Sequence, residues 1–262
     1  MLTERTLSTT GIDAIALKPT ECDVRAALDL GVETVAIDYE GREHLPDAAT
    51  LRALADNLTV YLTTPVRADG FDALGDGSLV ERVPPDVGRV LVAGNAAYLT
   101  EAERARAVAP RLRAALADYH EDAPAPWVGT EGIERLALAA GGVQYDLLGR
   151  ATERELRALR AVGFDGEVAV YAPTVLTADE DAILDALGGY VSRRRAVRRA
   201  LPDGAATDRT ATGRAREVLL AAADDFALVG TAESVREQVD ALHEAGATTV
   251  VGYPARGPAA FR

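Results

Sequence analysis

The sequence predicts a parallel α/β fold closed into a (β/α)8 TIM barrel, and two observations carry this prediction. One joint recurs along the chain: an amphipathic helix, then a glycine, then a short apolar strand. It is found around Gly31, Gly163 and Gly246. About eight strand-like runs alternate with helical patterns along the 262 residues. A helix that feeds a buried strand across a glycine is the repeating unit of parallel α/β proteins.

The predicted strands are short runs rich in apolar and β-branched residues, as buried strands require. In chain order they span residues 12–17, 32–37, 58–63, 89–92, 127–128, 143–148, 167–171 and 248–251. The clearest helical pattern between them runs over residues 100–120. Two segments, 69–77 and 201–213, have the composition of loops, and the second is long enough to suggest mobility or a function.

The end of the chain is the best-defined joint. Thr231 is placed to cap a helix whose apolar stripe is formed by Val235, Val239 and Leu242. Gly246 stops that helix, because glycine enters the left-handed conformation at little cost. The β-branched run that follows predicts a buried strand.

Composition limits the class of protein. Hydrophobic residues make up 48% of the chain, the formal net charge is −13, and Lys18 is the one lysine. This acidic, arginine-based composition resembles that of proteins from halophilic archaea, and it argues against nucleic-acid binding, which needs a basic face. No apolar run is long enough to span a membrane, and the polar first residues lack the apolar core of a signal peptide. We expect one cytoplasmic domain covering residues 1–262.

Metal and disulfide chemistry are not expected. Cys22 is the single cysteine, so no internal disulfide can form. His44, His120 and His243 are scattered and lack the spacing of ligands on one helix. His44 is the histidine closest to a predicted strand end, which makes it a secondary candidate for proton transfer.

Chemistry in such barrels takes place at the C-terminal ends of the strands. Asp38 follows the second strand and could act as a general base, with Tyr39 as an aromatic wall; the alternative is an acidic surface loop. Thr64 and the pair Gly94-Asn95 follow the third and fourth strands as hydrogen-bonding neighbours.

The turn after the fifth strand is a candidate phosphate site. Gly129, Thr130, Glu131 and Gly132 precede an apolar helix, and free N–H groups at a helix start attract anions. A plain βα turn is the other interpretation, and Glu131 would repel an anion.

Five arginines cluster in an otherwise acidic chain, namely Arg193, Arg194, Arg195, Arg198 and Arg199. One interpretation is a solvated helix face or a subunit contact. Another is a clamp for phosphate and carboxylate groups. Nucleic-acid contact is a third reading.

Three stretches resemble the luciferase-like superfamily of flavin-dependent and deazaflavin-dependent (coenzyme F-420) oxidoreductases. They are FALVGTAESVREQVDALHEAGATTVVGYP at the end of the chain, PWVGTEGIERLALAAGGVQYDLLG from Pro126, and LDLGVETVAIDYE from Leu28. The resemblance implies a (β/α)8 barrel, here shortened, that binds FMN or the deazaflavin at the strand ends and passes a hydride to or from a small substrate. It also implies a homodimer.

The same resemblance assigns roles to residues. Asp38 matches the acidic position after the second strand, but Tyr39 stands where the family often has histidine. Gly94-Asn95 matches the glycine-rich end of the fourth strand. Gly129, Thr130 and Gly132 match the turn near the phosphate-bearing tail of the cofactor.

Three functions therefore stay open. The first is a deazaflavin- or FMN-dependent hydride transfer to a small organic molecule. The second is a shortened, non-catalytic barrel that binds a flavin-like ligand or serves as a subunit of an assembly. The third is an unrelated barrel enzyme that acts on a phosphorylated metabolite.

Overall fold

The computed structural model describes residues 6–95, 97–119 and 123–262. This part of the chain divides into two compact units. The first, which we call the strand-rich unit, comprises Ala14–Asp146 and Asp165–Ala169. The second, the C-terminal unit, contains Leu147–Phe164, Val170–Arg262 and the segment up to Asp13. The single-domain organisation stays a prediction.

The strand-rich unit is built on six parallel strands that neighbour one another in the order β6-β5-β4-β3-β2-β1. They are β1 (Ala14–Leu17), β2 (Thr34–Ile37), β3 (Thr59–Pro65), β4 (Gly88–Val92), β5 (Trp127–Gly129) and β6 (Val143–Leu147). Most of their residues are buried on both faces, as in sheets covered by helices. All six lie where the sequence predicts a strand.

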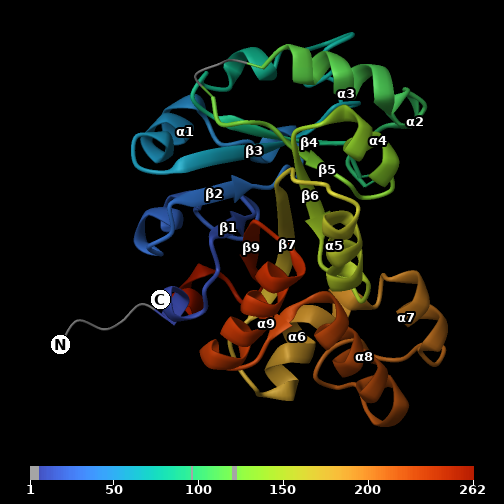
Figure 1. Cartoon of the computed structure of the whole chain (residues 1–262). Helices are drawn as coiled ribbons and strands as arrows, with labels where there is room; N and C mark the ends of the chain where they lie inside the picture. Colours follow the sequence, from blue (N-terminus) through green and yellow to red (C-terminus); the bar gives the residue numbers. More distant parts are fainter. Residues whose placement is uncertain (1–5, 96, 120–122) are drawn as a thin grey trace. The chain divides into compact units, whose positions relative to one another are not determined.

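Short helices connect these strands (Figure 1). They are η2 (Val24–Asp29), η3 (Arg42–His44), α1 (Ala48–Ala55), η4 (Val80–Arg82), α2 (Glu101–Arg104), α3 (Val108–Ala117) and α4 (Glu134–Ala140). A buried cluster formed by Val66, Leu91, Leu112, Val128 and others joins α3 and α4 to the outer faces of β4 and β5.

Two helix predictions in this unit need correction. The predicted continuous helix over residues 100–120 is two helices, α2 and α3, and its last residue, His120, lies outside the described part of the chain. Pro110 lies in the first turn of α3; without an N–H group, and with a ring that would collide with the carbonyl of residue 106, it forces a new start. The segment before Gly31 is a short 3-10 helix that starts at the Asp23 cap.

The C-terminal unit carries three strands in the order β9-β7-β8. They are β7 (Val168–Val175), β8 (Leu228–Val229) and β9 (Thr249–Pro254), and the two-residue β8 is not among the predicted strands. The helical elements are η1 (Thr6–Thr9), α5 (Thr152–Ala161), α6 (Glu180–Val191), α7 (Arg195–Ala200), α8 (Gly213–Phe226), α9 (Ala232–Ala245) and η5 (Pro258–Phe261).

The closing joint is confirmed. The Thr231 hydroxyl accepts a hydrogen bond from the N–H of Ser234 at 3.2 Å. Val235, Val239 and Leu242 are buried. Gly246 has φ +120°, and the C-terminal end of α9 is closed by its N–H.

No helix within the described ranges has both the length and the apolar character needed to cross a bilayer.

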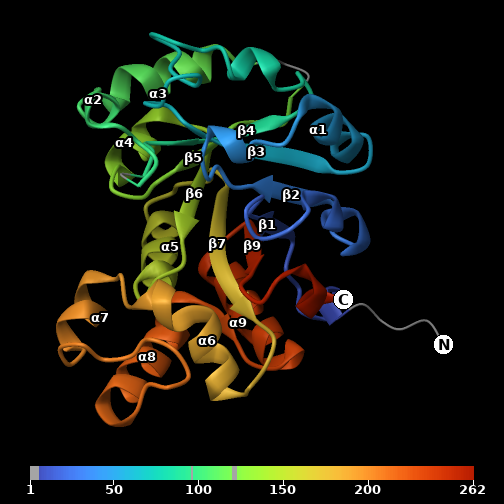
Figure 2. The same ribbon diagram turned by 180° about the vertical axis from the view of Figure 1, so that it is seen from behind.

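Helices α6, α7 and α8 enclose a second core within the C-terminal unit (Figure 2). Leu184 and Val191 of α6 pack against Ala215 and Leu219 of α8. The segment 201–213 returns across α6 so closely that a Cβ on Gly188 would lie 2.0 Å from the carbonyl oxygen of Thr207. This segment is therefore packed onto the helix.

The segment 69–77 is also folded. Phe71 is completely buried, and the carboxylate of Asp72 lies 3.2 Å from Arg106 Nη1 and 2.8 Å from Arg111 Nε. Glu103, in the capping box of α2, accepts a hydrogen bond from the N–H of Asp69 at 2.7 Å. These contacts tie the segment to α2 and α3.

We predict that Gly188→Ala strongly destabilises the protein, because the new methyl group has no room against the Thr207 backbone. Gly189→Ala is the matched control: it lies in the same helix, nothing stands within 4 Å of its Cβ position, and it should stabilise by about 0.5–1 kcal/mol through helix propensity. Thermal unfolding measures both. Equal effects of the two substitutions would contradict the close packing of segment 201–213.

A second prediction concerns pH. Burial opposes the charged form of Glu103, but hydrogen bonds from the Asp69 and Thr100 N–H groups and the Thr100 hydroxyl hold its pKa below the usual value. A lowered folded-state pKa contributes stability above the unfolded-state pKa of about 4.3 and loses it as pH falls through the folded value. Glu103→Gln should therefore cost roughly 1 kcal/mol at pH 7, of the order of a lost cap, and less in acid.

Denaturant unfolding of Glu103→Gln at pH 7 and at pH 4 and below measures this difference. Glu101→Gln is the control, since it shares the first turn of α2 and is exposed. A loss that does not depend on pH would show that the charge of Glu103 contributes nothing.

Candidate functional site

The C-terminal ends of β2 and β3 bring Asp38 and Thr63 together. The register pairs Ile37 with Leu62, so the residues that follow them stand side by side. The Thr63 hydroxyl donates to Asp38 Oδ1 at 3.5 Å, and the Asp38 N–H donates to the carbonyl of Leu17 at 2.9 Å. Asp38 is half-buried, so its carboxylate sits at the edge of the strands, held by its neighbours.

Tyr145 of β6 lies within electrostatic reach of Asp38. Complete burial, and then the negative charge of Asp38, raise the pKa of the Tyr145 phenol well above its ordinary value. The phenol therefore remains protonated at neutral pH. A carboxylate near a protonated phenol and a hydroxyl is an arrangement that can take up a proton and orient a polar ligand.

Thr130 and Asp146 form a second polar pair at the same edge. The Thr130 hydroxyl donates to Asp146 Oδ1 at 2.7 Å, and its N–H donates to the carbonyl of Tyr145 at 3.0 Å. Thr130 thus joins the ends of β5 and β6.

An aromatic stack lies among the same strands. The rings of Tyr61 and Trp127 are 4.2 Å apart at 24°, and those of Trp127 and Tyr145 are 5.3 Å apart at 29°. Burial, with a smaller contribution from the charge of Glu167, raises the pKa of Tyr61 to about 12. Trp127 is the first residue of β5 and Tyr61 the third of β3, so this uncharged stack lies toward the N-terminal ends of these strands.

Tyr145 and Asp146 are functional candidates that the sequence reasoning missed. Asp146 lies near the C-terminal end of the predicted strand 143–148, where barrel chemistry is expected, and Tyr145 directly precedes it. Polar residues inside an apolar run are the signal that could have identified them.

Tyr39 and His44 lie apart from this carboxylate. The Tyr39 ring packs edge-on against Phe71 at 5.4 Å and Tyr98 at 6.2 Å, so it closes onto the segment after β3. His44 is exposed in η3, with Nε2 3.7 Å from Glu43 Oε1. Glu40 accepts hydrogen bonds from the N–H and hydroxyl of Thr20 and holds the loop after β1.

Gly94 and Asn95 shape the loop after β4. Gly94 has φ +94°, and a Cβ there would lie 2.9 Å from Leu99 and 3.1 Å from Pro65. The Asn95 side chain accepts from the N–H of Ala97 at 2.8 Å, and both residues are exposed. Arg67 donates hydrogen bonds to the carbonyls of Ala93, Gly94 and Arg104 and so holds the loop after β4 in place.

Thr64 faces away from Thr63, because neighbours along a strand alternate between faces. It is fully buried, its hydroxyl lies 3.4 Å from the carbonyl of Val90, and it accepts from Arg89 Nε at 3.4 Å. The structure thus places Thr64 on the helix-facing side of β3.

The turn after β5 is tightly fitted at one end and open at the other. A Cβ on Gly129 would lie 2.7 Å from Val92, whereas nothing stands within 4 Å of the Cβ position of Gly132, whose φ is +71°. The N–H of Gly132 donates to Glu134 Oε1 at 3.2 Å, and Glu131 is exposed. The carboxylate of Glu134 thus occupies one N–H group of the predicted phosphate turn.

The arginine cluster is largely a solvated surface. Arg193, Arg195, Arg198 and Arg199 are exposed. Arg194 stacks over the rings of Tyr190 and Phe226, with its guanidinium carbon 4.8 and 5.3 Å from their centroids.

Within residues 6–95, 97–119 and 123–262, no three His, Cys, Asp or Glu side chains are grouped as a metal site. His243 instead lies on α9 with Nε2 3.1 Å from Asp13 Oδ2.

Comparison with known proteins shows the fold. A solved structure described as an F420-dependent secondary alcohol dehydrogenase in complex with an F420-acetone adduct is similar, with a TM-score of 0.57 and 15% sequence identity over 92% of each chain. The predicted α/β barrel class is thereby confirmed. No curated protein matches the chain. A family model described as a family of unknown function (DUF7388) matches residues 7–261. The chain belongs to this family.

Proposed function

We propose that the chain binds a deazaflavin (coenzyme F-420) at the C-terminal ends of its strands and transfers a hydride between this cofactor and a small organic substrate. The observation that carries the proposal is the half-buried carboxylate of Asp38, which accepts from the Thr63 hydroxyl and lies within electrostatic reach of the protonated Tyr145 phenol. The fold shared with an F420-dependent alcohol dehydrogenase favours the deazaflavin over FMN.

The chemistry of the side chains fits the ring of such a cofactor. A flat ring with carbonyl and N–H groups along its edge needs both donors and acceptors. Tyr145 would supply a donor, and Asp38 would supply an acceptor, as would the lone pairs of Thr63, whose own proton goes to Asp38. The anionic tail needs positive charge, and Lys18, which follows β1 at the same edge with Nζ 3.5 Å from Glu21, is one cation that the strand-rich unit offers there.

The cofactor, when bound, supplies the hydride chemistry, and the protein supplies orientation and proton control. Asp38 would hold the proton that a substrate hydroxyl gives up or a carbonyl takes on. Tyr145 stays protonated and would fix the orientation of a polar group beside Asp38. Thr130, bonded to Asp146, keeps the ends of β5 and β6 in place.

A non-catalytic ligand-binding barrel is the second candidate, and one observation favours it. Tyr39 occupies the position where the resembling family often has histidine, and its ring packs against Phe71 and Tyr98. A chain of this kind would bind the cofactor and turn over no substrate.

Fluorescence titration in high salt tests cofactor binding, and we expect the deazaflavin to bind more tightly than FMN. Asp38→Asn should retain binding within a few-fold and lower turnover of a small secondary alcohol by about 10²–10⁴-fold, the usual contribution of a general base. His44→Gln should leave turnover unchanged if Asp38 carries the proton. Asp240→Asn, on the exposed face of α9, is the control.

Binding of neither cofactor at high micromolar concentration would refute the proposal. Binding without turnover of aldehydes, alcohols or pterin adducts would favour the non-catalytic barrel. Loss of turnover in His44→Gln, with Asp38→Asn active, would move the proton to the histidine.

A further inference from the structure

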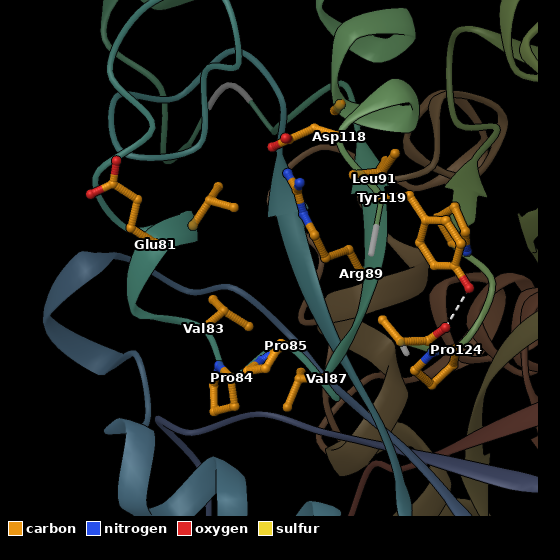
Figure 3. Close-up of a pocket in the computed structure, with 14 residues that line it drawn as sticks. Glu81, Val83, Pro84, Pro85, Val87, Arg89, Leu91, Asp118, Tyr119 and Pro124 are labelled. Carbon is orange, nitrogen blue, oxygen red and sulfur yellow. Dashed lines mark hydrogen bonds between the residues drawn. The ribbon is translucent and has the colours of Figure 1, made fainter. Parts of the chain in front are cut away.

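A cavity of about 450 Å³ lies on the helix-facing side of β4, at the opposite end of that strand from Gly94 and Asn95. Its walls are mostly apolar. They come from the loop after η4 (Val83, Pro84, Pro85, Val87), from β4 (Leu91), from α3 (Ala115) and from the segment before β5 (Ala123, Pro124, Pro126). Figure 3 shows these walls on both sides of a single arginine, Arg89.

Arg89 extends from the second residue of β4 into this space (Figure 3). Its Nε donates to the Thr64 hydroxyl at 3.4 Å. Its Nη2 is buried and, among the described residues, has no hydrogen-bond partner. Burial lowers the pKa of the guanidinium, and the charge of Asp118 offsets this only in part. Buried polar groups are nearly always hydrogen-bonded. A ligand that enters the cavity could supply the hydrogen bond that Arg89 Nη2 lacks.

We propose that this cavity binds a small molecule that carries one carboxylate on a compact apolar body, with the carboxylate on Arg89. A guanidinium offers a planar pair of donors that matches a carboxylate. The proline and valine walls suit an aliphatic or aromatic body, which gains by leaving water.

The charges around the cavity favour a monoanion over a dianion. Asp118 and Glu81 line it together with Arg89, so a second negative charge on a ligand would add repulsion without a second cation to meet it. Asp118 and a bound carboxylate compete for the same guanidinium. The Tyr119 hydroxyl donates to the carbonyl of Ala123 and is therefore part of the wall.

The site is independent of the redox proposal, because it lies on the other face and at the other end of β4. The site should also affect the stability of the ligand-free protein. An enclosed charge with incomplete hydrogen bonding costs folding free energy until a ligand satisfies it.

Thermal unfolding and calorimetric titration with benzoate and hexanoate test the site in the full chain. We expect both acids to raise the Tm and the uncharged benzamide and inorganic phosphate to leave it unchanged. Arg89→Met should have a Tm equal to or above that of the wild type without ligand and should lose the shift with benzoate. Asp118→Asn should bind benzoate more tightly, on the order of fivefold, because one repelling charge is removed.

Arg82→Met is the matched control, since Arg82 is exposed on η4 and does not line the cavity; it should retain the wild-type shift. The proposal would be overturned if Arg89→Met kept the benzoate shift, if phosphate or benzamide gave the same shift as benzoate, or if neither acid bound the wild type. A lower Tm of ligand-free Arg89→Met would also overturn it, by showing that the guanidinium is already satisfied within the fold.

Discussion

The in-register parallel pairing of β1 to β6 is the constraint on which the candidate site depends. Because successive side chains alternate between the two faces, a slip of one residue would move Asp38 and Thr63 off their common face. The pairing of Ile37 with Leu62 therefore fixes Asp38 beside Thr63. Gly129 imposes a similar constraint between β4 and β5, because a Cβ there would lie 2.7 Å from the Val92 side chain.

The C-terminal edge of these strands is rich in carboxylates and hydroxyls. What these groups can do depends on their hydrogen bonds and protonation states. Asp38 and Asp146 each accept from a threonine hydroxyl, and Tyr145 is kept protonated by its surroundings. Barrels host many unrelated reactions, so the fold alone identifies none of them. The redox proposal rests on these groups, and Tyr39, at a position where the resembling superfamily often has histidine, keeps a binding-only role in competition with it.

Much of the fold was predictable because single residues decide it locally. Thr231 caps α9 and Gly246 ends it through its own backbone conformation, and buried apolar runs define the strands. The break before α3 was missed because the helical periodicity continues through Pro110. The partners of Asp38 were harder to predict: Thr63 and Tyr145 are 25 and 107 residues away in sequence, and only the strand order β6-β5-β4-β3-β2 relates them. Nothing in the local sequence distinguishes Arg89 from an exposed strand arginine. The cavity around it is formed by the loop after η4, by α3 and by the segment before β5, which are far apart in the sequence.

The central claim is that the strand edge around Asp38 holds the ring of the redox cofactor. A crystal structure of the chain grown with the deazaflavin tests it most directly. The account predicts the ring within hydrogen-bond distance of Asp38 and Thr63, above the stack of Tyr61, Trp127 and Tyr145. A ring bound elsewhere on the chain, with Asp38 in contact only with protein, would contradict it.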